Sequence, residues 1–129
     1  MLLRWIVFEF VLNIYWFGSV YYRPLNLIEI IEAVTGTSYT VEEFMKIGER
    51  INTLCRAFNV REGITKKDDY LPARFMEPLE GGPTGGQSIT SEEFNSMLND
   101  YYDICSWDPE TGIPKKEKMI ELGLEFASI

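Results

Sequence analysis

"TVEEFMKIGERINTLCRAFNVREG", residues 40–63, is the stretch that decides the fold. Thr40 followed by Glu43 forms a capping box, in which each side chain accepts a hydrogen bond from the other residue's backbone N–H. Apolar side chains then recur at intervals of three and four residues, the period of one helix face. They are Phe44, Ile47, Ile51, Leu54 and Phe58. The stretch therefore predicts a long amphipathic helix that ends at Gly63.

Further helices are predicted on both sides of this one. Residues 25–34 place apolar side chains at helical intervals, and Gly36 follows as a stop signal. A second capping box at 90–93 begins a helix whose apolar residues share one side. A short last helix is expected over 114–122, because it opens on a proline and is followed by a glycine.

The segment between the two capping boxes is predicted to be a loop. Residues 64–89 contain three prolines and four glycines, with one helical turn expected at 72–76. The fold class that follows is all-α, with about five helices and a long Gly/Pro-rich loop. We expect a single helical domain over residues 1–129, an ordinary size for one domain.

The first 22 residues, "MLLRWIVFEFVLNIYWFGSVYY", are strongly apolar. Residues 3–17 are interpreted as a buried helix, although their β-branched and aromatic content leaves a strand possible. A membrane-associated segment and a signal peptide are the alternatives. Glu9 and Asn13 interrupt the run where a charge would be costly in a membrane, which disfavours a span. A core helix this apolar would need covering by a partner chain or by a second copy of this chain.

Composition excludes several classes of function. The chain has 129 residues and a net charge of −8, and residues 81–129 carry three basic against nine acidic side chains. An acidic tail argues against nucleic-acid binding, which needs a basic surface. There is no histidine, so no Ser-His or Cys-His pair can form within the chain. Two cysteines without a Cys-x-x-Cys pattern are typical of reduced thiols in a cytoplasmic protein.

Four short patterns have both a functional and a plain interpretation. "GGPTGG" at 81–86 lacks the lysine and preceding strand of a phosphate loop, so a flexible linker is favoured. "DPETG" at 108–112 lacks the length of a calcium loop and is interpreted as a turn. Asp68 and Asp69 could form a metal or acid–base pair, but a solvated or salt-bridged pair is favoured. The thiols of Cys55 and Cys105 are both predicted to be structural, Cys55 by packing within its helix.

Three blocks in order resemble the C-terminal domain of the aldehyde ferredoxin oxidoreductases. They are "EAVTGTSYTVEEFMKIGERINTLCRAFNVREG" at 32–63, "TKKDDYLPARFMEPLEGGPTGGQ" at 65–87 and "LNDYYDICSWDPETGIPKKEKMIELGLE" at 98–125. Over residues 1–31 the resemblance is weaker. It implies membership of a family of large cytoplasmic enzymes that oxidise aldehydes to carboxylic acids and reduce ferredoxin. Their cofactors are a tungsten, sometimes molybdenum, ion on two pterins and a four-iron cluster.

The chain departs from the family at its amino-terminal end. The family's Asp-x-x-Gly-Leu-Cys motif, aligned with "LRWIVFEF", puts Leu3 at the aspartate, Ile6 at the glycine, Val7 at the leucine and Phe8 at the cluster cysteine. Phenylalanine cannot ligate iron, and a cluster usually needs four thiolates. We therefore expect no catalytic, cofactor-binding or metal-binding residue in this chain alone.

The charge cluster at 61–69 could be an active site, a docking surface or a solvated helix end. The resemblance implies a segment that packs across the domain, which makes docking the favoured hypothesis. The residues expected to pair across an interface are Arg61, Glu62, Lys66, Asp68 and Asp69. The function predicted for the chain is that of a detached C-terminal domain, inactive alone, whose partner carries the pterin and the cluster. The alternatives are a helical scaffold, or a truncated remnant, without redox function, and a small protein anchored to a membrane by residues 1–22.

Overall fold

The computed structural model describes residues 23–127, and these residues are helical. Among them the only β-type pairing is an isolated bridge between Trp107 and Pro114. The α-helices are α3 (Pro24–Thr35), α4 (Val41–Arg61), α5 (Ser91–Cys105) and α6 (Lys116–Glu121), and the short 3-10 turns are η2 (Lys66–Asp68), η3 (Ala73–Met76) and η4 (Glu125–Ala127). The all-α prediction is confirmed. The additional helix expected over residues 3–17 lies outside the described residues.

Both capping boxes form as the sequence predicts. The backbone N–H of Glu43 donates to Thr40 Oγ1 at 3.2 Å, and the Thr40 N–H donates back to Glu43 Oε2 at 2.8 Å. Thr90 and Glu93 repeat the arrangement at the start of α5. Each box satisfies backbone N–H groups that have no partner within the helix. The two longest helices therefore begin where local chemistry dictates.

The predicted apolar face of α4 is buried at its start and exposed toward its end. Phe44 is buried against α3, but Leu54 is 37% exposed and Phe58 is 54% exposed. The other helices pack on the opposite side of α4, where Asn52 donates to Tyr101 of α5 at 2.9 Å. Lys118 of α6 pairs with Glu49 on this side as well, at 2.6 Å. Periodicity located an apolar face, but it could not say which face the neighbours would cover.

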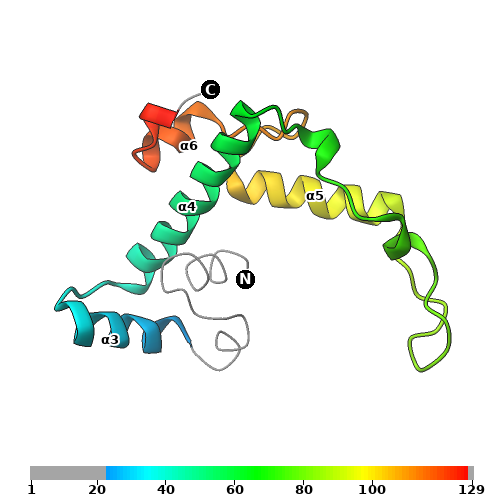
Figure 1. Cartoon of the computed structure of the whole chain (residues 1–129), viewed down its shortest axis with the longest axis horizontal. Coiled ribbons are helices and arrows are strands. Elements are labelled where there is room, and N and C mark those ends of the chain that lie inside the picture. Colours follow the sequence, from blue (N-terminus) through cyan, green and yellow to red (C-terminus); the bar gives the residue numbers. More distant parts are fainter. Residues whose placement is uncertain (1–22, 128–129) are drawn as a thin grey trace.

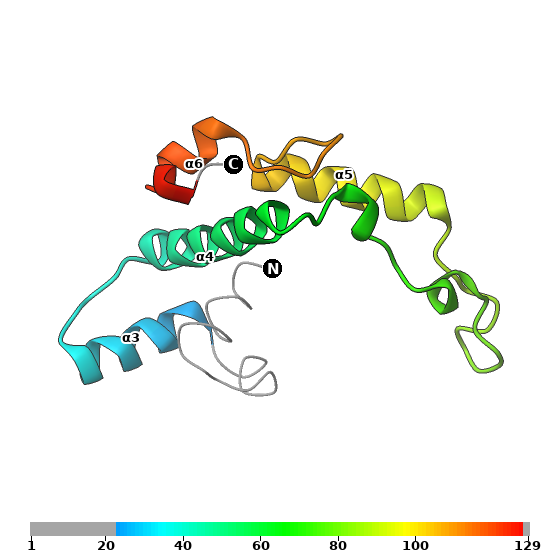
Figure 2. The same ribbon diagram turned by 45° about the horizontal axis from the view of Figure 1, so that its top comes forward.

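The described helices form an extended arrangement with three small hydrophobic clusters. One joins α3 to the start of α4, one joins α4 to α6 and η4, and one lies at the end of α5. Figures 1 and 2 show α3 at one end of α4 and α5 leading away from the other end. The clusters thus fix neighbouring elements pairwise and leave much apolar surface uncovered.

Residues 71–90 form an arm that extends beyond the start of α5 (Figures 1 and 2). The predicted helical turn is present as η3. Backbone hydrogen bonds close the arm on itself, from Leu79 N–H to the Gln87 carbonyl and from Gly86 N–H to the Leu79 carbonyl, both at 2.9 Å. "GGPTGG" is the exposed turn at its tip, in keeping with a linker. Among residues 23–127, no helix is long and apolar enough to cross a bilayer.

Candidate functional site: an arginine clamp at the end of α4

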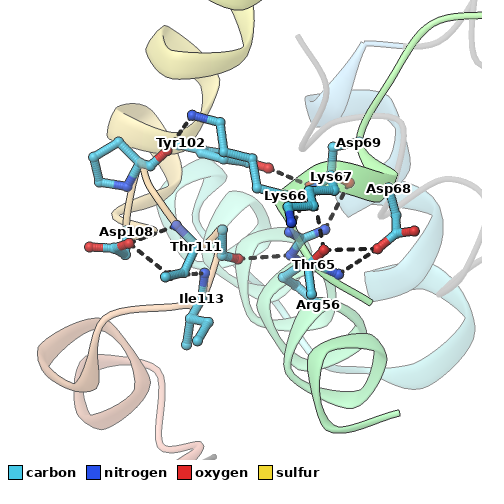
Figure 3. A network of polar contacts seen from close by, with 12 residues as sticks. Arg56, Thr65, Lys66, Lys67, Asp68, Asp69, Tyr102, Asp108, Thr111 and Ile113 are labelled. Carbon is cyan, nitrogen blue, oxygen red and sulfur yellow. Dashed lines mark hydrogen bonds and ion pairs between the residues drawn. The ribbon is translucent and has the colours of Figure 1, made fainter. Parts of the chain in front are cut away.

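A buried arginine near the end of α4 is the centre of the most extensive polar network in the described residues. Arg56 lies on the inner face of the helix, and its side chain is only 7% exposed. Its guanidinium binds both carboxylate oxygens of Asp69, with Nη1–Oδ1 at 2.9 Å and Nη2–Oδ2 at 2.6 Å. This bidentate geometry is the strongest form of arginine–carboxylate pairing. Figure 3 shows Arg56 pointing from α4 toward the segment that contains Asp69.

Two further segments join the same pair. The Tyr102 hydroxyl of α5 donates a short hydrogen bond to the Asp69 carboxylate, and Arg56 Nε donates to the Gly112 carbonyl at 2.8 Å. The guanidinium carbon also lies 5.2 Å from the centroid of the Trp107 ring, within cation–π range. We name Arg56, Asp69, Tyr102 and Gly112 the clamp. The clamp ties α4, α5, residues 64–70 and the loop 106–115 to one point.

The loop that supplies Gly112 is shaped by Asp108. One oxygen of its carboxylate accepts from the N–H of Glu110 at 3.1 Å, the N–H of Thr111 at 2.8 Å and the Thr111 hydroxyl at 2.7 Å. Gly112 follows with φ of 73°, a left-handed conformation that favours glycine. The turn predicted for "DPETG" is confirmed. Its aspartate is engaged with backbone and hydroxyl donors.

Residues 64–70, which we name the strap, carry the predicted charge cluster onto the clamp. Lys66 Nζ donates to the Pro109 carbonyl and to Asn99 Oδ1, the latter at 3.2 Å. Asp68 caps the η2 turn by accepting from the Thr65 N–H at 2.8 Å. Asp69 is salt-bridged, one of the two outcomes favoured for the Asp68–Asp69 pair. These three residues therefore fix the strap within the chain.

Arg61 and Glu62 lie apart from the clamp. They pair with each other at 3.1 Å, and their side chains are 65% and 55% exposed. The Arg61 guanidinium also lies 4.9 Å from the centroid of the Phe58 ring. The docking role expected for the five charged residues remains a prediction. In the structure Arg61 and Glu62 are exposed at the end of α4. Lys66, Asp68 and Asp69 instead form hydrogen bonds within the chain, as part of the strap.

The electrostatics of the clamp favour a fixed hydrogen-bond pattern. Burial, reinforced by the hydrogen bond to Asp69, raises the pKa of Tyr102 to about 12. Tyr102 therefore stays protonated at neutral pH and remains a donor to the carboxylate. Asp69 accepts from Arg56 and Tyr102 together, which leaves it poorly placed to act as a general base. The clamp holds segments of the chain in position through these bonds.

The two cysteines differ in their surroundings. Cys105 is buried beside Tyr102 and Trp107, which confirms its structural role, and burial raises the pKa of its thiol. Cys55 is exposed, so its predicted packing within α4 was wrong. Burial keeps the Cys105 thiol protonated and unreactive at neutral pH.

The described residues do not fit a metal or an iron–sulfur cluster. No group of three or more Asp, Glu, Cys or His side chains converges among residues 23–127. The only two cysteines of the chain lie on separate helices, one exposed and one buried, whereas a cluster needs four thiolates. We therefore derive no chemical step through such a group in this chain.

Sequence reasoning missed Arg56, Tyr102 and Gly112 as members of one site. Arg56 lies off the predicted apolar stripe, where an arginine is ordinarily solvated. Its partners come from positions 13, 46 and 56 residues further along the chain. No local pattern signals a contact of that length. Only the turn at residues 108–112, predicted from "DPETG", was visible in the sequence.

The Asp108 cap should make the loop acid-sensitive. Hydrogen bonds from the Thr111 hydroxyl and backbone lower the pKa of Asp108 below its ordinary value of 3.8. The cap's contribution to stability is therefore full above the ordinary pKa and is lost as the pH falls through the lowered folded-state pKa.

In Asp108→Asn the side-chain amide oxygen can still accept hydrogen bonds, but the side chain no longer titrates. We expect the urea midpoint to fall less between about pH 5 and about pH 3 than in the parent. Glu110→Gln, which removes a neighbouring carboxylate outside the cap, should leave that fall unchanged, and an equal fall in both variants would contradict the prediction.

Fold and clamp together define a small helical unit whose segments are tied to one buried ion pair. A family model described as "Aldehyde ferredoxin oxidoreductase, domains 2 & 3" matches residues 10–124. The chain belongs to this family. The match begins well before residue 32, so it includes part of the amino-terminal segment in which the resemblance was weaker.

Curated relatives and a solved structure agree with this assignment. The tungsten-containing aldehyde ferredoxin oxidoreductase of Pyrococcus furiosus is 40% identical over 98 residues, 74% of this chain and 16% of the relative. The "Aliphatic sulfonate oxidoreductase, WOR-like subunit" of the same organism is 36% identical over 105 residues, 77% of this chain and 17% of the relative. The BamBC active-site complex of benzoyl coenzyme A reductase has a chain that matches with a TM-score of 0.65 and 29% identity. That match covers 82% of this chain and 14% of the other. The chain thus spans about a sixth of the length of these proteins.

Proposed function

We propose that this chain is the C-terminal helical part of an aldehyde ferredoxin oxidoreductase-type enzyme and is inactive alone. It would complete the enzyme by docking onto a chain that carries the tungstopterin and the four-iron cluster. In the assembled enzyme, an aldehyde would be oxidised to a carboxylic acid and ferredoxin reduced. The cytoplasm, which keeps thiols reduced, is the compartment that suits the two free cysteines.

The observation that carries this proposal is the apolar surface left uncovered on every helix within residues 23–127 and on the arm. Exposed side chains include Val34 (80%) on α3, Ile104 (76%) on α5 and Phe126 (75%) on η4. Single exposed apolar residues are ordinary, but here they accompany three small clusters instead of one continuous core. Such a surface calls for a partner.

The arm is the docking element that the structure supports best. A groove of about 450 Å³ lies along it between η3 and residues 87–89. Phe75 (53% exposed) and Leu79 (56% exposed) line this groove and offer apolar anchors. The clamp fixes the strap immediately before the arm, so the arm leaves the helices in a set direction. A preorganised arm loses less conformational entropy on docking than a free loop would.

The names of two similar proteins support an assembly of several chains. One relative is named as a subunit, and the solved structure is an active-site complex. This chain's own residues do not fit the cluster, which a partner would then supply. The partner remains to be identified by experiment.

A second candidate is a helical scaffold, or a truncated remnant, without redox function. It is favoured by Phe8, which stands where the family alignment expects the cluster cysteine. The two candidates differ in whether metal appears when a partner is supplied. We therefore test both in one experiment.

The test is co-expression of the full chain with the proteins encoded beside it, followed by purification without oxygen. Tungsten and iron are measured by mass spectrometry in the chain alone and in any complex. Both metals recovered only with a partner chain would support the proposed function. A folded chain that recovers neither metal nor partner would overturn it in favour of the scaffold or remnant.

The arm gives a sharper version of the same test. Phe75→Asp with Leu79→Asp places two charges on the apolar groove and should reduce recovery of the partner at least about tenfold, as for loss of a binding hot spot. Val34→Asp, at a more exposed apolar residue on α3, is the control, because α3 lies at the opposite end of the molecule from the arm (Figure 1). Equal recovery for the arm and control variants would exclude the arm as the docking element.

Arg61 provides the test of the charge cluster. Its ion pair with Glu62 is exposed, so Arg61→Ala should leave thermal unfolding almost unchanged. If Arg61 docks, the same substitution should weaken recovery of the partner. Unchanged recovery would remove Arg61 from the docking surface. Asp69 is not a suitable position for this docking test, because its substitution would also break the ion pair with Arg56.

A further inference from the structure

The first half of α4 borders a pocket that includes neither the clamp nor the arm. The pocket has a volume of about 250 Å³. It is lined by Tyr39, Glu43, Lys46, Ile47, Arg50 and Leu122. The four lining residues on α4 share one helix face, because they recur at helical intervals. Tyr39 belongs to the link between α3 and α4, and Leu122 is the C-cap of α6, so the pocket lies between these two segments.

Part of the pocket lining is apolar and is held by two hydrophobic clusters. Leu122 is only 4% exposed and belongs to the cluster that joins α4 to α6 and η4. Tyr39 packs against the cluster that joins α3 to α4, and Ile47 is half-buried. Such a lining favours a ligand that covers it with apolar atoms, because this removes apolar surface from water.

Lys46 and Arg50 place two positive charges one helical turn apart on the pocket lining. Within residues 23–127 neither side chain forms an ion pair. Arg50 Nη2 donates to the Gly123 carbonyl at 3.3 Å, which holds the guanidinium beside the α6 turn and leaves its other donors available. Glu121 lies within electrostatic reach of Lys46, but its carboxylate is bound by Lys118 at 2.9 Å. A chain with a net charge of −8 therefore keeps two cations here without an anionic partner.

We propose that this pocket binds a small monocarboxylate whose apolar body lies on Ile47 and Leu122. The guanidinium of Arg50 binds the carboxylate through two parallel N–H donors, and Lys46 adds a second positive charge. The volume suits a ligand the size of benzoate, since pockets for drug-sized ligands span about 300–1,000 Å³. The site uses residues of this chain alone, so it goes beyond the proposed function and does not depend on docking.

Glu43 restricts the charge of the ligand. Its Oε2 accepts from the Thr40 N–H at 2.8 Å and from the Thr40 hydroxyl at 2.9 Å. These hydrogen bonds lower the pKa of Glu43, which therefore stays ionised at neutral pH. A fixed negative charge on the lining opposes a second negative charge on the ligand. The pocket should therefore favour a monocarboxylate over a dicarboxylate or inorganic phosphate.

The test is a titration of the full ¹⁵N-labelled chain at neutral pH and constant ionic strength, followed by ¹H–¹⁵N correlation spectra. Benzoate should give saturable shifts at the backbone amides of Tyr39, Ile47 and Leu122, with a Kd on the order of 1 mM. Benzamide has the same ring without the charge, and inorganic phosphate has charge without a ring. Phthalate adds a second carboxylate to the ring. Each of these three probes should bind at least about fivefold more weakly than benzoate.

Two variants assign the binding to the pocket. Arg50→Gln and Lys46→Gln should each weaken benzoate binding at least about fivefold, because each removes one positive charge beside the carboxylate. Lys116→Gln removes an exposed lysine of α6 outside the pocket and is the matched control, which should bind benzoate like the parent. The dispersion of the same spectra shows whether each variant is folded.

Several results would overturn the proposal. Unchanged benzoate affinity in a folded Arg50→Gln variant would exclude the pocket, and so would shifts confined to other residues or shifts that do not saturate. Benzamide binding as tightly as benzoate would remove the carboxylate from the recognition. Phosphate binding as tightly would reduce the site to a general anion patch. The chain is titrated alone, so failure here leaves the co-purification result standing.

Discussion

Replacing Arg56 by methionine should lower the free energy of unfolding by about 3 kcal/mol, the lower end of the range for breaking a buried ion pair. Methionine keeps most of the side-chain volume but removes every donor. Asp69 then loses its bidentate partner, and the Gly112 carbonyl loses its hydrogen bond from Nε. The lower end applies because the Asp69 side chain is 26% exposed, so water can replace part of what is lost.

Urea unfolding followed by far-UV circular dichroism measures this effect. The matched control is Arg61→Met on the same helix, whose exposed pair should contribute less than about 1 kcal/mol. The double variant Arg56→Met with Asp69→Leu should recover part of the loss, because it removes the uncompensated carboxylate as well. A loss for Arg56→Met no larger than that for Arg61→Met would show that the clamp does not stabilise the fold.

Gly112→Ala is expected to have the second-largest effect, about 2–4 kcal/mol, from backbone strain together with disruption of the clamp. A Cβ at this position would lie 2.2 Å from Arg56 Nη2 and 3.0 Å from the Tyr102 hydroxyl. An arginine end group can ordinarily move aside, but this one is bound by two carboxylate oxygens. The alanine would therefore have to push the guanidinium away from Asp69. The φ of 73° adds strain of its own.

Gly36→Ala separates the two causes. Gly36 has nearly the same φ, 72°, but nothing lies within 4 Å of its added Cβ. It should therefore show the backbone cost alone, about 1–2 kcal/mol. Both variants are compared by urea unfolding. Equal losses would mean that the Arg56 side chain relaxes freely around the new methyl group. If disruption of the clamp is the cause, the double variant Arg56→Met with Gly112→Ala should lose less free energy of unfolding than the two single variants lose in sum.

The sequence by itself determined where the helices begin and end. The capping boxes at Thr40 and Thr90, and the stop at Gly36, act within one helical turn, so local chemistry is sufficient to specify them. The order of three distinctive blocks was likewise enough to indicate the family. These features depend on residues close together in the chain.

The tertiary structure alone decided which side of α4 is buried and which residues form the clamp. An amphipathic pattern defines an apolar face, but the direction from which α5 and α6 approach depends on contacts far along the chain. Those helices cover the side with Asn52 and Arg56 and leave Leu54 and Phe58 exposed. Arg56 becomes a buried residue only because Asp69, Tyr102 and Gly112 converge on it. A buried charge needs partners, and here distant segments supply them, which no local pattern in the sequence encodes.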